Sequence, residues 1–546
     1  MRISIGVLVL FLTACSGETE PIPDLVLAGG KVFTADLAAP WAEAVAIRGE
    51  RILAVGSDAE VRALARAGTR VIELDGRVVV PGLNDAHRHF ELTAPGSRQL
   101  AVTPLEPSWN ELETALREAV ATTPPGTWIE GTIGVTVMID PRIDRDRLDG
   151  LAPDHPVRLA TFYGHGDIYN SRALTELGVG DTEADPLGGT WERAAGTGRL
   201  NGRVFEYPQW NARRRLNDQV EAAVVVERLR AEVAEMLAAG ITSTQDMSML
   251  SLRRFVEGLI EADLPIRVRA IRFPGTDERA RRVDEDRDVS VPAHLAGRIA
   301  IAGTKWILDG TPLERGAAMR QPYQDAPDQR GRLNFPAEEV AAMLRESIAR
   351  DGIAADEQLL FHAVGDHALD VLLSAMESMP EVDWPARRVR VEHGDGLFPD
   401  LAERAARLGV VVVQNPTHFA LPAIVQRVGP DRGFQPLRSL LDAGIPLALG
   451  SDGPPNPWLD VMLATIHPAT PAEAITVEQA IVAYTRGAAF AEFQEHHKGT
   501  LAAGKLADLA VLSQDVFAIP PSALPGTRSV LTLIGGEIVH DAGDVR

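Results

Sequence analysis

Apolar runs and amphipathic stretches alternate along most of the chain. Eight segments are candidates for buried strands, most of them rich in Val, Ile or Leu, at 78–83, 241–245, 266–272, 299–308, 359–362, 389–393, 410–414 and 445–450. Helical patterns lie between several of them, at 220–239, 337–349 and 401–408. Apolar strands joined by helices form parallel sheets, so the alternation predicts an α/β fold. Eight such strands predict a (β/α)8 TIM-like barrel.

The two ends of the chain have a different pattern, in which short strands are separated by turns. The strands are expected at 24–27, 44–47 and 51–55 near the start, and at 507–512 and 529–534 near the end. Both ends are β-rich and they flank the βα-rich middle. We therefore expect 24–77 and 500–546 to form one small β-sandwich built from both termini, with the barrel spanning 78–499.

The gap between the first two predicted barrel strands is too long for a single helix. Residues from about 92 to 215 contain a strand of their own at 156–162 and a glycine-rich stretch at 188–202. An insertion that follows the carboxyl end of a barrel strand lies over the barrel mouth. We expect it to form a lid and much of the substrate pocket.

The first residues have the pattern of an export signal. After Met1 and Arg2, an apolar run covers 3–12, which is too short to span a bilayer, and Leu12-Thr13-Ala14-Cys15 resembles the lipobox of bacterial lipoprotein precursors. The resemblance implies a signal peptide over 1–14, lipidation of Cys15 and a tether over 15–23. Ser16 stands where an aspartate commonly retains such proteins at the inner membrane, which favours the outer-membrane side of the periplasm. The alternative, an ordinary secretory signal with a chance cysteine, also implies export.

Composition narrows the classes of partner. A hydrophobic content of 45% is ordinary for a globular protein with a sizeable core. The formal net charge of -22 disfavours nucleic acid and an anionic lipid surface as partners, although solubility alone accounts for such a charge. Cys15 is the only cysteine, so internal disulfides are excluded. We expect a small-molecule substrate, membrane contact only through the lipid anchor, and leave a homo-oligomer open.

Candidate chemistry begins at the end of the first predicted strand. His87 and His89 are two residues apart, and strand side chains alternate, so both imidazoles project from one face. The active site of an α/β barrel lies at the carboxyl ends of its strands. The pair can hold one metal ion, and the alternative is two imidazoles hydrogen-bonded to loop backbone.

Ligand-type residues also end four later strands. They are Lys305 on the fourth strand, His362 on the fifth, His393 on the sixth and Asp452 on the eighth. Each lies at the carboxyl end of its strand, so with His87 and His89 they predict a single centre at the barrel mouth.

Lys305 has a further argument of its own. The chain holds 54 Lys plus Arg, and lysine occurs only at 31, 305, 498 and 505. A positive charge inside the apolar run at 299–308 is costly without a partner. A primary amine can lose its proton and capture carbon dioxide as a carbamate, whereas a guanidinium cannot. The alternative is a lysine paired with Asp309 or with a substrate carboxylate.

These residues, taken in order, resemble the amidohydrolase superfamily, and most closely its third amidohydrolase family, which includes N-substituted formamide deformylases. The motifs that carry the resemblance are Pro81-Gly82-Leu83-Asn84-Asp85-Ala86-His87-Arg88-His89, Asn170-Ser171-Arg172-Ala173-Leu174, Lys305-Trp306-Ile307-Leu308-Asp309-Gly310, His362-Ala363-Val364-Gly365-Asp366, Val391-Glu392-His393, Gly450-Ser451-Asp452-Gly453-Pro454 and Gly504-Lys505-Leu506-Ala507-Asp508-Leu509. They are specific for the family and say little about the substrate.

The resemblance implies the ligand set and the cofactor. His87, His89 and Asp452 would bind a buried divalent metal ion, His362 and His393 a second one, and Lys305, as N6-carboxylysine, would bridge the two. Nitrogen and oxygen ligands suit zinc, with manganese, iron or cobalt as alternatives and one metal per chain as the other stoichiometry. Asp452 would act as the catalytic proton acceptor.

Two motifs depart from the family pattern. Asn415-Pro416-Thr417-His418 has asparagine where the family often has glutamine, and Tyr163-Gly164-His165 has tyrosine in place of aspartate. We expect His165 to be catalytic, orienting the substrate carbonyl, with a structural histidine in a glycine turn as the alternative. His418 has the same two interpretations. Structural or surface roles are favoured for Glu206, Asp366, His367 and His496-His497. For Asp246, a hydrogen bond to a residue of the site and a helix-cap role are left open equally.

The sequence thus predicts an amidohydrolase that cleaves a non-peptide carbon–nitrogen bond of an amide, formamide or cyclic amide by metal-activated water. An ester, lactone or phosphoester hydrolase using the same metal site is one alternative. A catalytically inactive lipoprotein that only binds its ligand is the other.

Overall fold

The computed structural model describes residues 21–349, 352 and 357–545. The predicted signal peptide, Cys15 and most of the tether lie outside the described residues. Within the described part of the chain, no helix is both long enough and apolar enough to cross a membrane.

The middle of the chain forms an eight-stranded sheet in the order β8-β15-β16-β17-β18-β19-β20-β21. Its strands are β8 (Leu83–Arg88), β15 (Ile241–Asp246), β16 (Arg267–Arg272), β17 (Ile299–Ile307), β18 (Leu359–Ala363), β19 (Arg390–His393), β20 (Val411–Gln414) and β21 (Leu447–Leu449). All the paired neighbours are parallel. The first and last strands meet where the Asp452 N–H donates to the His87 carbonyl at 2.9 Å. This nearly closed arrangement confirms the predicted TIM-like barrel.

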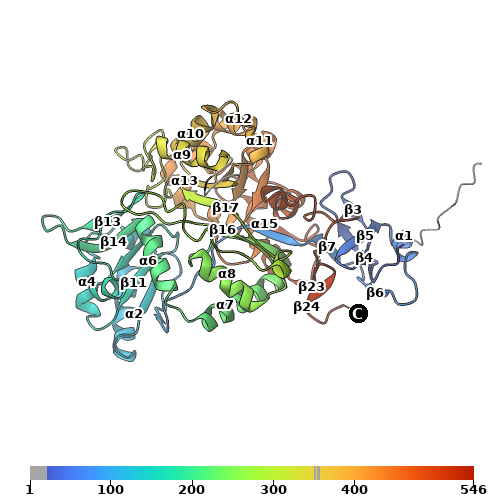
Figure 1. Ribbon diagram of the computed structural model, residues 1–546, viewed down its shortest axis with the longest axis horizontal. Helices are drawn as coiled ribbons and strands as arrows, with labels where there is room; N and C mark the ends of the chain where they lie inside the picture. The colour runs from blue at the N-terminus through green and yellow to red at the C-terminus, as the bar shows by residue number, and fades with distance from the viewer. Residues whose placement is uncertain (1–20, 350–351, 353–356, 546) are drawn as a thin grey trace, which may run out of the picture.

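Helices cover the outside of the barrel (Figure 1). They include α7 (Ala222–Ala239), α8 (Leu252–Ala262), α9 (Ala337–Ile348), α10 (Asp366–Glu377), α12 (Pro399–Arg407), α15 (Pro457–Ile466) and α16 (Val477–Val482). Their apolar faces join the strands in one continuous core that includes Leu229, Leu372 and Leu401. Helix α7 ends at Gly240, whose left-handed backbone (φ 89) lets the chain turn directly into β15.

The prediction of a first barrel strand over 78–83 is wrong. Val78–Pro81 forms β7, which pairs with β2 (Lys31–Phe33) and β22 (Leu509–Leu512) in a sheet outside the barrel. The barrel strand begins only at Leu83, after Gly82. Residues 78–83 are apolar throughout and both strands are buried, so the pattern gives no sign that the chain leaves one sheet at Pro81 and enters another at Leu83.

The strands at the two ends of the chain build two sheets. One has the order β5-β4-β1-β6 and the other β24-β23-β22-β7-β2-β3, so that strands from both ends join the second sheet. Their remaining bounds are β1 (Leu25–Ala28), β3 (Trp41–Ala42), β4 (Ala44–Arg48), β5 (Arg51–Gly56), β6 (Arg70–Glu73), β23 (Ser529–Ile534) and β24 (Glu537–Asp541), with α1 (Asp58–Arg62) beside them. Leu27, Val79 and Leu531 belong to one apolar core shared by these sheets. We call this unit, residues 24–81 and 500–545, the end domain.

The insertion forms a third unit, at the opposite side of the barrel from the end domain (Figure 1). Its mixed sheet has the order β13-β14-β12-β11-β10-β9. The elements are β9 (Arg98–Gln99), β10 (Ile129–Ile133), β11 (Val157–Thr161), β12 (Gly166–Tyr169), β13 (Gly189–Arg193) and β14 (Leu200–Glu206), with α2 (Trp109–Thr122), α3 (Val135–Met138), α4 (Arg145–Leu151), α5 (Ser171–Glu176) and α6 (Tyr207–Asn217). It follows the carboxyl end of β8, so it lies on the side of the barrel that carries His87.

Barrel closure depends on a glycine, which gives a first prediction. A Cβ atom at Gly450 would lie 2.3 Å from the His87 backbone nitrogen, a distance that no side chain tolerates without movement of the backbone. We expect Gly450→Ala to lower the free energy of unfolding by about 1–3 kcal/mol, as overpacking of a tight core does. Urea denaturation measures this. Gly297→Ala is the control, because a Cβ there meets nothing within 4 Å. Equal stability of the two variants would contradict the predicted clash.

Candidate metal centre

His87 and His89 point their Nε2 atoms at a common position. The two Nε2 atoms are 3.3 Å apart. The His87 Nδ1 is 2.6 Å from Glu392 Oε2, and the His89 Nδ1 is 2.5 Å from the Met247 carbonyl. Because an acceptor holds each Nδ1–H, the Nε2 lone pairs are left free to bind a metal ion.

Lys305 and Asp452 reach the same position from strands on either side. Lys305 Nζ lies 3.1 Å from His87 Nε2. Asp452 Oδ1 lies 3.6 Å from the Nε2 atoms of both His87 and His89. His87, His393 and Asp452 each bring a ligand atom within 4.8 Å of the others, a spacing compatible with one shared ion. The backbone of Asp452 is in the left-handed region (φ 43), a strained conformation of the kind often found at functional sites.

His362 and His393 lie beside this group of residues. Their ring centroids are 4.5 Å apart, and His393 Nε2 is 3.9 Å from Asp452 Oδ2. Both residues are buried, and His362 Nε2 and His393 Nδ1 have no hydrogen-bond partner among the described residues. A buried polar atom without a partner costs about 1–3 kcal/mol, and a metal ion removes this cost. The residues present therefore fit the metal that the ligand pattern implies.

Burial tunes the imidazoles for metal binding. Burial and then Lys305 lower the pKa of His89 to about 4. Burial also holds the pKa values of His87, His362 and His393 well below the ordinary value, and neighbouring basic groups add to the effect. All four rings are therefore neutral at pH 7, which is the state that binds a metal ion.

The pKa values of Lys305 and Asp452 are both lowered, which favours a neutral amine and a charged carboxylate. Burial lowers the pKa of the Lys305 amine to about 8, and Arg390 adds to this effect against Glu392 and Asp452. Burial works to raise the pKa of Asp452, but His87, His89, His418 and Lys305 hold it well below the ordinary value. Lys305 thus loses its proton more easily than an exposed lysine, and Asp452 is an anion at neutral pH.

The structure does not support the alternative pairing of Lys305 with Asp309. The Asp309 carboxylate instead accepts the backbone N–H groups of Ala318, Val364 and Gly365, at 2.8–3.0 Å. Burial raises the pKa of Asp309 to about 8, against the effect of these hydrogen bonds. Asp309 therefore shapes the loops beside His362 and leaves Lys305 facing the histidines.

Sequence reasoning missed the residues that hold His87. Glu392 accepts from His87 and is held in turn by Arg390, whose Nε and Nη2 donate to its two carboxylate oxygens at 2.9 and 3.0 Å. Arg390 also donates to the Ala86 carbonyl at 2.8 Å. The sequence does contain a signal for them: Arg390 and Glu392 are charged residues at alternate positions of the apolar run at 389–393, and buried charges require partners.

His165 comes from the turn between β11 and β12 in the insertion. Its ring centroid is 4.9 Å from that of His362, so the insertion brings it to the edge of the histidine cluster. Its Nδ1 is 3.0 Å from Glu206 Oε1. Burial works to lower the pKa of His165, but the contact with Glu206 raises it overall.

Glu206 was expected to be a solvated or structural carboxylate, but it contacts His165. It is buried, its Oε2 accepts from Asn334 Nδ2 at 2.9 Å, and its backbone is in a strained region with φ 63. Glu314 joins it, since ligand atoms of His165, Glu206 and Glu314 lie within 4.8 Å of one another. Glu314 was not considered at all from the sequence.

Other sequence candidates are placed as follows. His418 stacks on His393 with centroids 5.4 Å apart, and its Nε2 is 3.6 Å from Asp452 Oδ2, so it lies at the centre. Asn415 donates to the Gly450 carbonyl at 2.9 Å. Asp366 pairs with Arg320, Asp246 pairs with Arg88, and His367, His496 and His497 are exposed.

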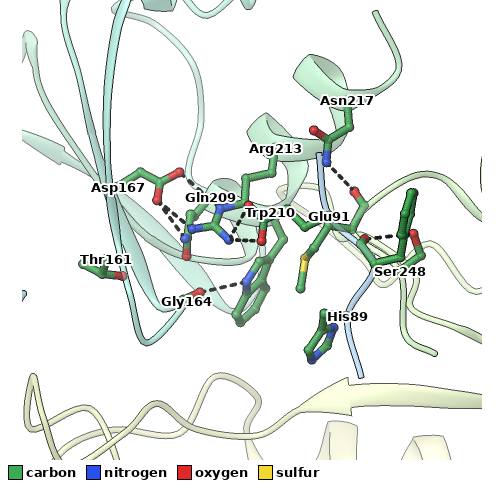
Figure 2. A network of polar contacts seen from close by, with 12 residues as sticks. His89, Glu91, Thr161, Gly164, Asp167, Gln209, Trp210, Arg213, Asn217 and Ser248 are labelled. Atoms are coloured by element: carbon green, nitrogen blue, oxygen red, sulfur yellow. Dashed lines mark hydrogen bonds and ion pairs between the residues drawn. The ribbon is translucent and has the colours of Figure 1, made fainter. Parts of the chain in front are cut away.

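A buried polar network joins the insertion to the segment after His89 (Figure 2). Arg213 of α6 donates to Asp167 Oδ1 at 3.0 Å and to Glu91 Oε2 at 3.2 Å. Trp210 of the same helix donates its indole N–H to the Gly164 carbonyl at 3.1 Å, next to His165. One helix therefore fixes both the turn that carries His165 and the chain that leaves His89.

Comparisons with known proteins agree with this geometry. A model described as the amidohydrolase family matches residues 70–540. The chain is 30% identical to LONG AFTER FAR-RED 3 of Arabidopsis thaliana, with 97% of this chain and 94% of that protein covered. It is 27% identical to the N-substituted formamide deformylase of Arthrobacter pascens, with 95% and 98% covered. An uncharacterized metal-dependent hydrolase from Pyrococcus horikoshii superimposes with a TM-score of 0.69 at 22% identity, over 91% of this chain and 99% of that one, which shows a shared fold.

Proposed function

We propose that this chain, which belongs to the amidohydrolase family, uses a metal centre at its barrel mouth to hydrolyse a non-peptide amide, formamide or cyclic amide of a small molecule. The observation that carries the proposal is the convergence of neutral imidazoles, Lys305 and Asp452, with two buried imidazole nitrogens that have no hydrogen-bond partner in the described part of the chain. The relative named as a formamide deformylase supports the class of bond.

We assign the metal ligands as the resemblance to the family implies. His87, His89 and Asp452 would hold one ion and His362 and His393 a second, with carboxylated Lys305 between them. Imidazole and carboxylate ligands suit zinc. When bound, such ions lower the pKa of water to about 7 and polarise a carbonyl group.

Asp452 and His165 have different roles in the proposed reaction. Asp452 takes the proton of the attacking water and passes it to the leaving nitrogen, a role that needs an anion beside the reacting atoms. His165, held through Nδ1 by Glu206 and with its ring beside that of His362, orients the substrate carbonyl. Glu206 fixes the ring and acts as a positioning residue.

The role of Glu206 gives a second prediction. Glu206→Gln removes the charged partner of His165, and a hydrogen bond to a charged group contributes about 1.5–3 kcal/mol. We expect kcat/KM to fall at least about tenfold with unchanged metal content, and the His165 pKa, followed by NMR, to fall as well.

The control for this prediction is Glu357→Gln. Glu357 is a half-buried glutamate that pairs with Arg272 at 2.8 Å and Arg287 at 2.6 Å, and it precedes β18, away from the histidines. Wild-type kcat/KM in Glu206→Gln would show that its contact with His165 has no catalytic role.

The proposed activity is tested with the mature chain supplied with zinc or manganese. Elemental analysis is expected to give about two metals per chain. N-substituted formamides, N-acyl amino acids and small aryl amides are then compared with esters, lactones and phosphoesters of similar shape. Faster hydrolysis of amides supports the proposal. Activity on esters or phosphoesters alone favours the alternative bond class, and metal binding without turnover favours a protein that only binds its ligand.

We also propose that the protein is exported and anchored by a lipid on Cys15, on the basis of the lipobox-like residues before it. Mass spectrometry of the membrane-extracted chain tests this, since an N-terminal diacylglyceryl cysteine is expected. An unmodified Cys15, or a chain that begins at another residue, would contradict it.

A further inference from the structure

The hairpin between β2 and β3 in the end domain carries an unusual run of exposed apolar residues. Leu37-Ala38-Ala39-Pro40-Trp41 are all exposed, and they follow one another without a charge. Leu37 is 73% exposed and Trp41 41%, and Leu37 is the most exposed large apolar side chain in the described part of the chain. We call residues 37–41 the apolar tip.

The apolar tip is held in one conformation. The Thr34 N–H donates to the Pro40 carbonyl at 3.0 Å, and the Thr34 hydroxyl donates to the Ala39 carbonyl at 2.7 Å. Asp36, the charged residue nearest in sequence, accepts the Ala38 N–H at 3.0 Å. A surface that is already ordered loses little conformational entropy when it binds.

The base of the tip combines an aromatic cluster with a cation. The ring of Trp41 is 5.0 Å from Phe33 and 4.7 Å from Phe517. Lys31 Nζ lies 4.9 Å from the Trp41 ring and 2.9 Å from Asp515. An exposed tryptophan beside a lysine, next to a leucine, is the side-chain combination found where proteins meet the lipid–water interface.

We propose that the apolar tip docks on the lipid surface to which the chain is anchored. The net charge does not oppose this, because residues 24–81 and 500–546 carry thirteen acidic and ten basic side chains, so most of the charge of -22 lies in the barrel and insertion. Cys15 precedes Leu25 of β1 by ten residues, which span at most ~36 Å when extended. An anchor there keeps the end domain within reach of the bilayer.

This docking also orients the metal centre. β7 of the end domain leads directly into β8, and His87 lies at the far end of β8. The barrel mouth and the insertion are therefore on the side away from the end domain (Figure 1). With the tip on the lipid, the mouth faces the aqueous compartment, so its substrates arrive from solution.

The experiment uses a chain in which residues 1–15 are replaced by a hexahistidine tag. This chain has no cysteine, so Leu37→Cys introduces a single site for an environment-sensitive NBD label. Ile139→Cys, 48% exposed in the insertion, is the matched control. Vesicles of phosphatidylethanolamine, phosphatidylglycerol and a nickel-chelating lipid replace the natural anchor. The result therefore does not depend on whether Cys15 is lipidated. The inference itself rests on the proposed lipid anchor, which would hold the protein at the membrane.

We expect the vesicles to shift the emission at position 37 to the blue and raise it at least about twofold, with no change at position 139. Adding Ala38→Glu to the labelled chain should remove the rise. Equal responses at positions 37 and 139 would overturn the proposal. So would a vesicle-independent rise that grows with protein concentration and accompanies a dimer in ultracentrifugation, because the tip would then join two copies.

Discussion

Asp452→Asn is expected to abolish turnover while leaving most of the bound metal in place. The asparagine has nearly the same size, and its side-chain oxygen can still lie 3.6 Å from the Nε2 atoms of His87 and His89. An amide cannot accept a proton at neutral pH, so the transfer from water to the leaving nitrogen is lost. General acid–base catalysis contributes about 10²–10⁴-fold, and we expect kcat to fall by about 10³-fold.

Elemental analysis and steady-state kinetics on the same preparation measure both parts of this prediction. Asp366→Asn is the matched control, because Asp366 also follows a barrel strand but is paired with Arg320 at 2.7 Å. That variant should keep both metal and activity. A normal kcat in Asp452→Asn would remove Asp452 from the proton transfer, and a joint loss of metal and activity would make it a ligand only.

Much of the barrel could be predicted from sequence because several of its strands, such as β18 and β20, contain apolar runs. The strands predicted at 241–245 and 359–362 correspond to β15 and β18, each of which extends one residue further at its carboxyl end. The first strand could not be placed, since β7 and β8 are both fully buried and only Gly82 separates them. Periodicity reports burial, and it does not report which of two cores a strand enters.

The histidines and Asp452 could be placed for a related reason. Each lies at the carboxyl end of its strand, so the barrel itself brings them together. Glu206 and Glu314 could not be found this way, because they come from the insertion and from a loop after β17, whose positions depend on tertiary contacts. The position of His165 likewise depends on Trp210 and Arg213 of α6, far from it in sequence.

Lys305→Ala is expected to reduce the metal content sharply, from about two ions per chain, and to lower kcat/KM at least about a hundredfold. The amine is buried and lies 3.1 Å from His87 Nε2, and its pKa is lowered to about 8. An appreciable unprotonated fraction is therefore present at neutral pH, and only this form captures carbon dioxide. Wild-type protein given ¹³C-bicarbonate should show a carbamate signal in the ¹³C spectrum, and the variant should lack it.

The control for Lys305→Ala is Lys498→Ala, which removes another buried lysine. Lys498 pairs with Glu492 at 2.9 Å and donates to Ser243 at 2.8 Å, near the start of β15 and away from the carboxyl ends of the strands. Its loss should lower stability and leave the metal content and the carbamate signal intact. Retention of both metals in Lys305→Ala would show that Lys305 is not a metal ligand and acts only as a charged neighbour of His87. Retention of one metal with measurable turnover would instead assign catalysis to the ion held by His87, His89 and Asp452, because their contacts do not depend on the lysine.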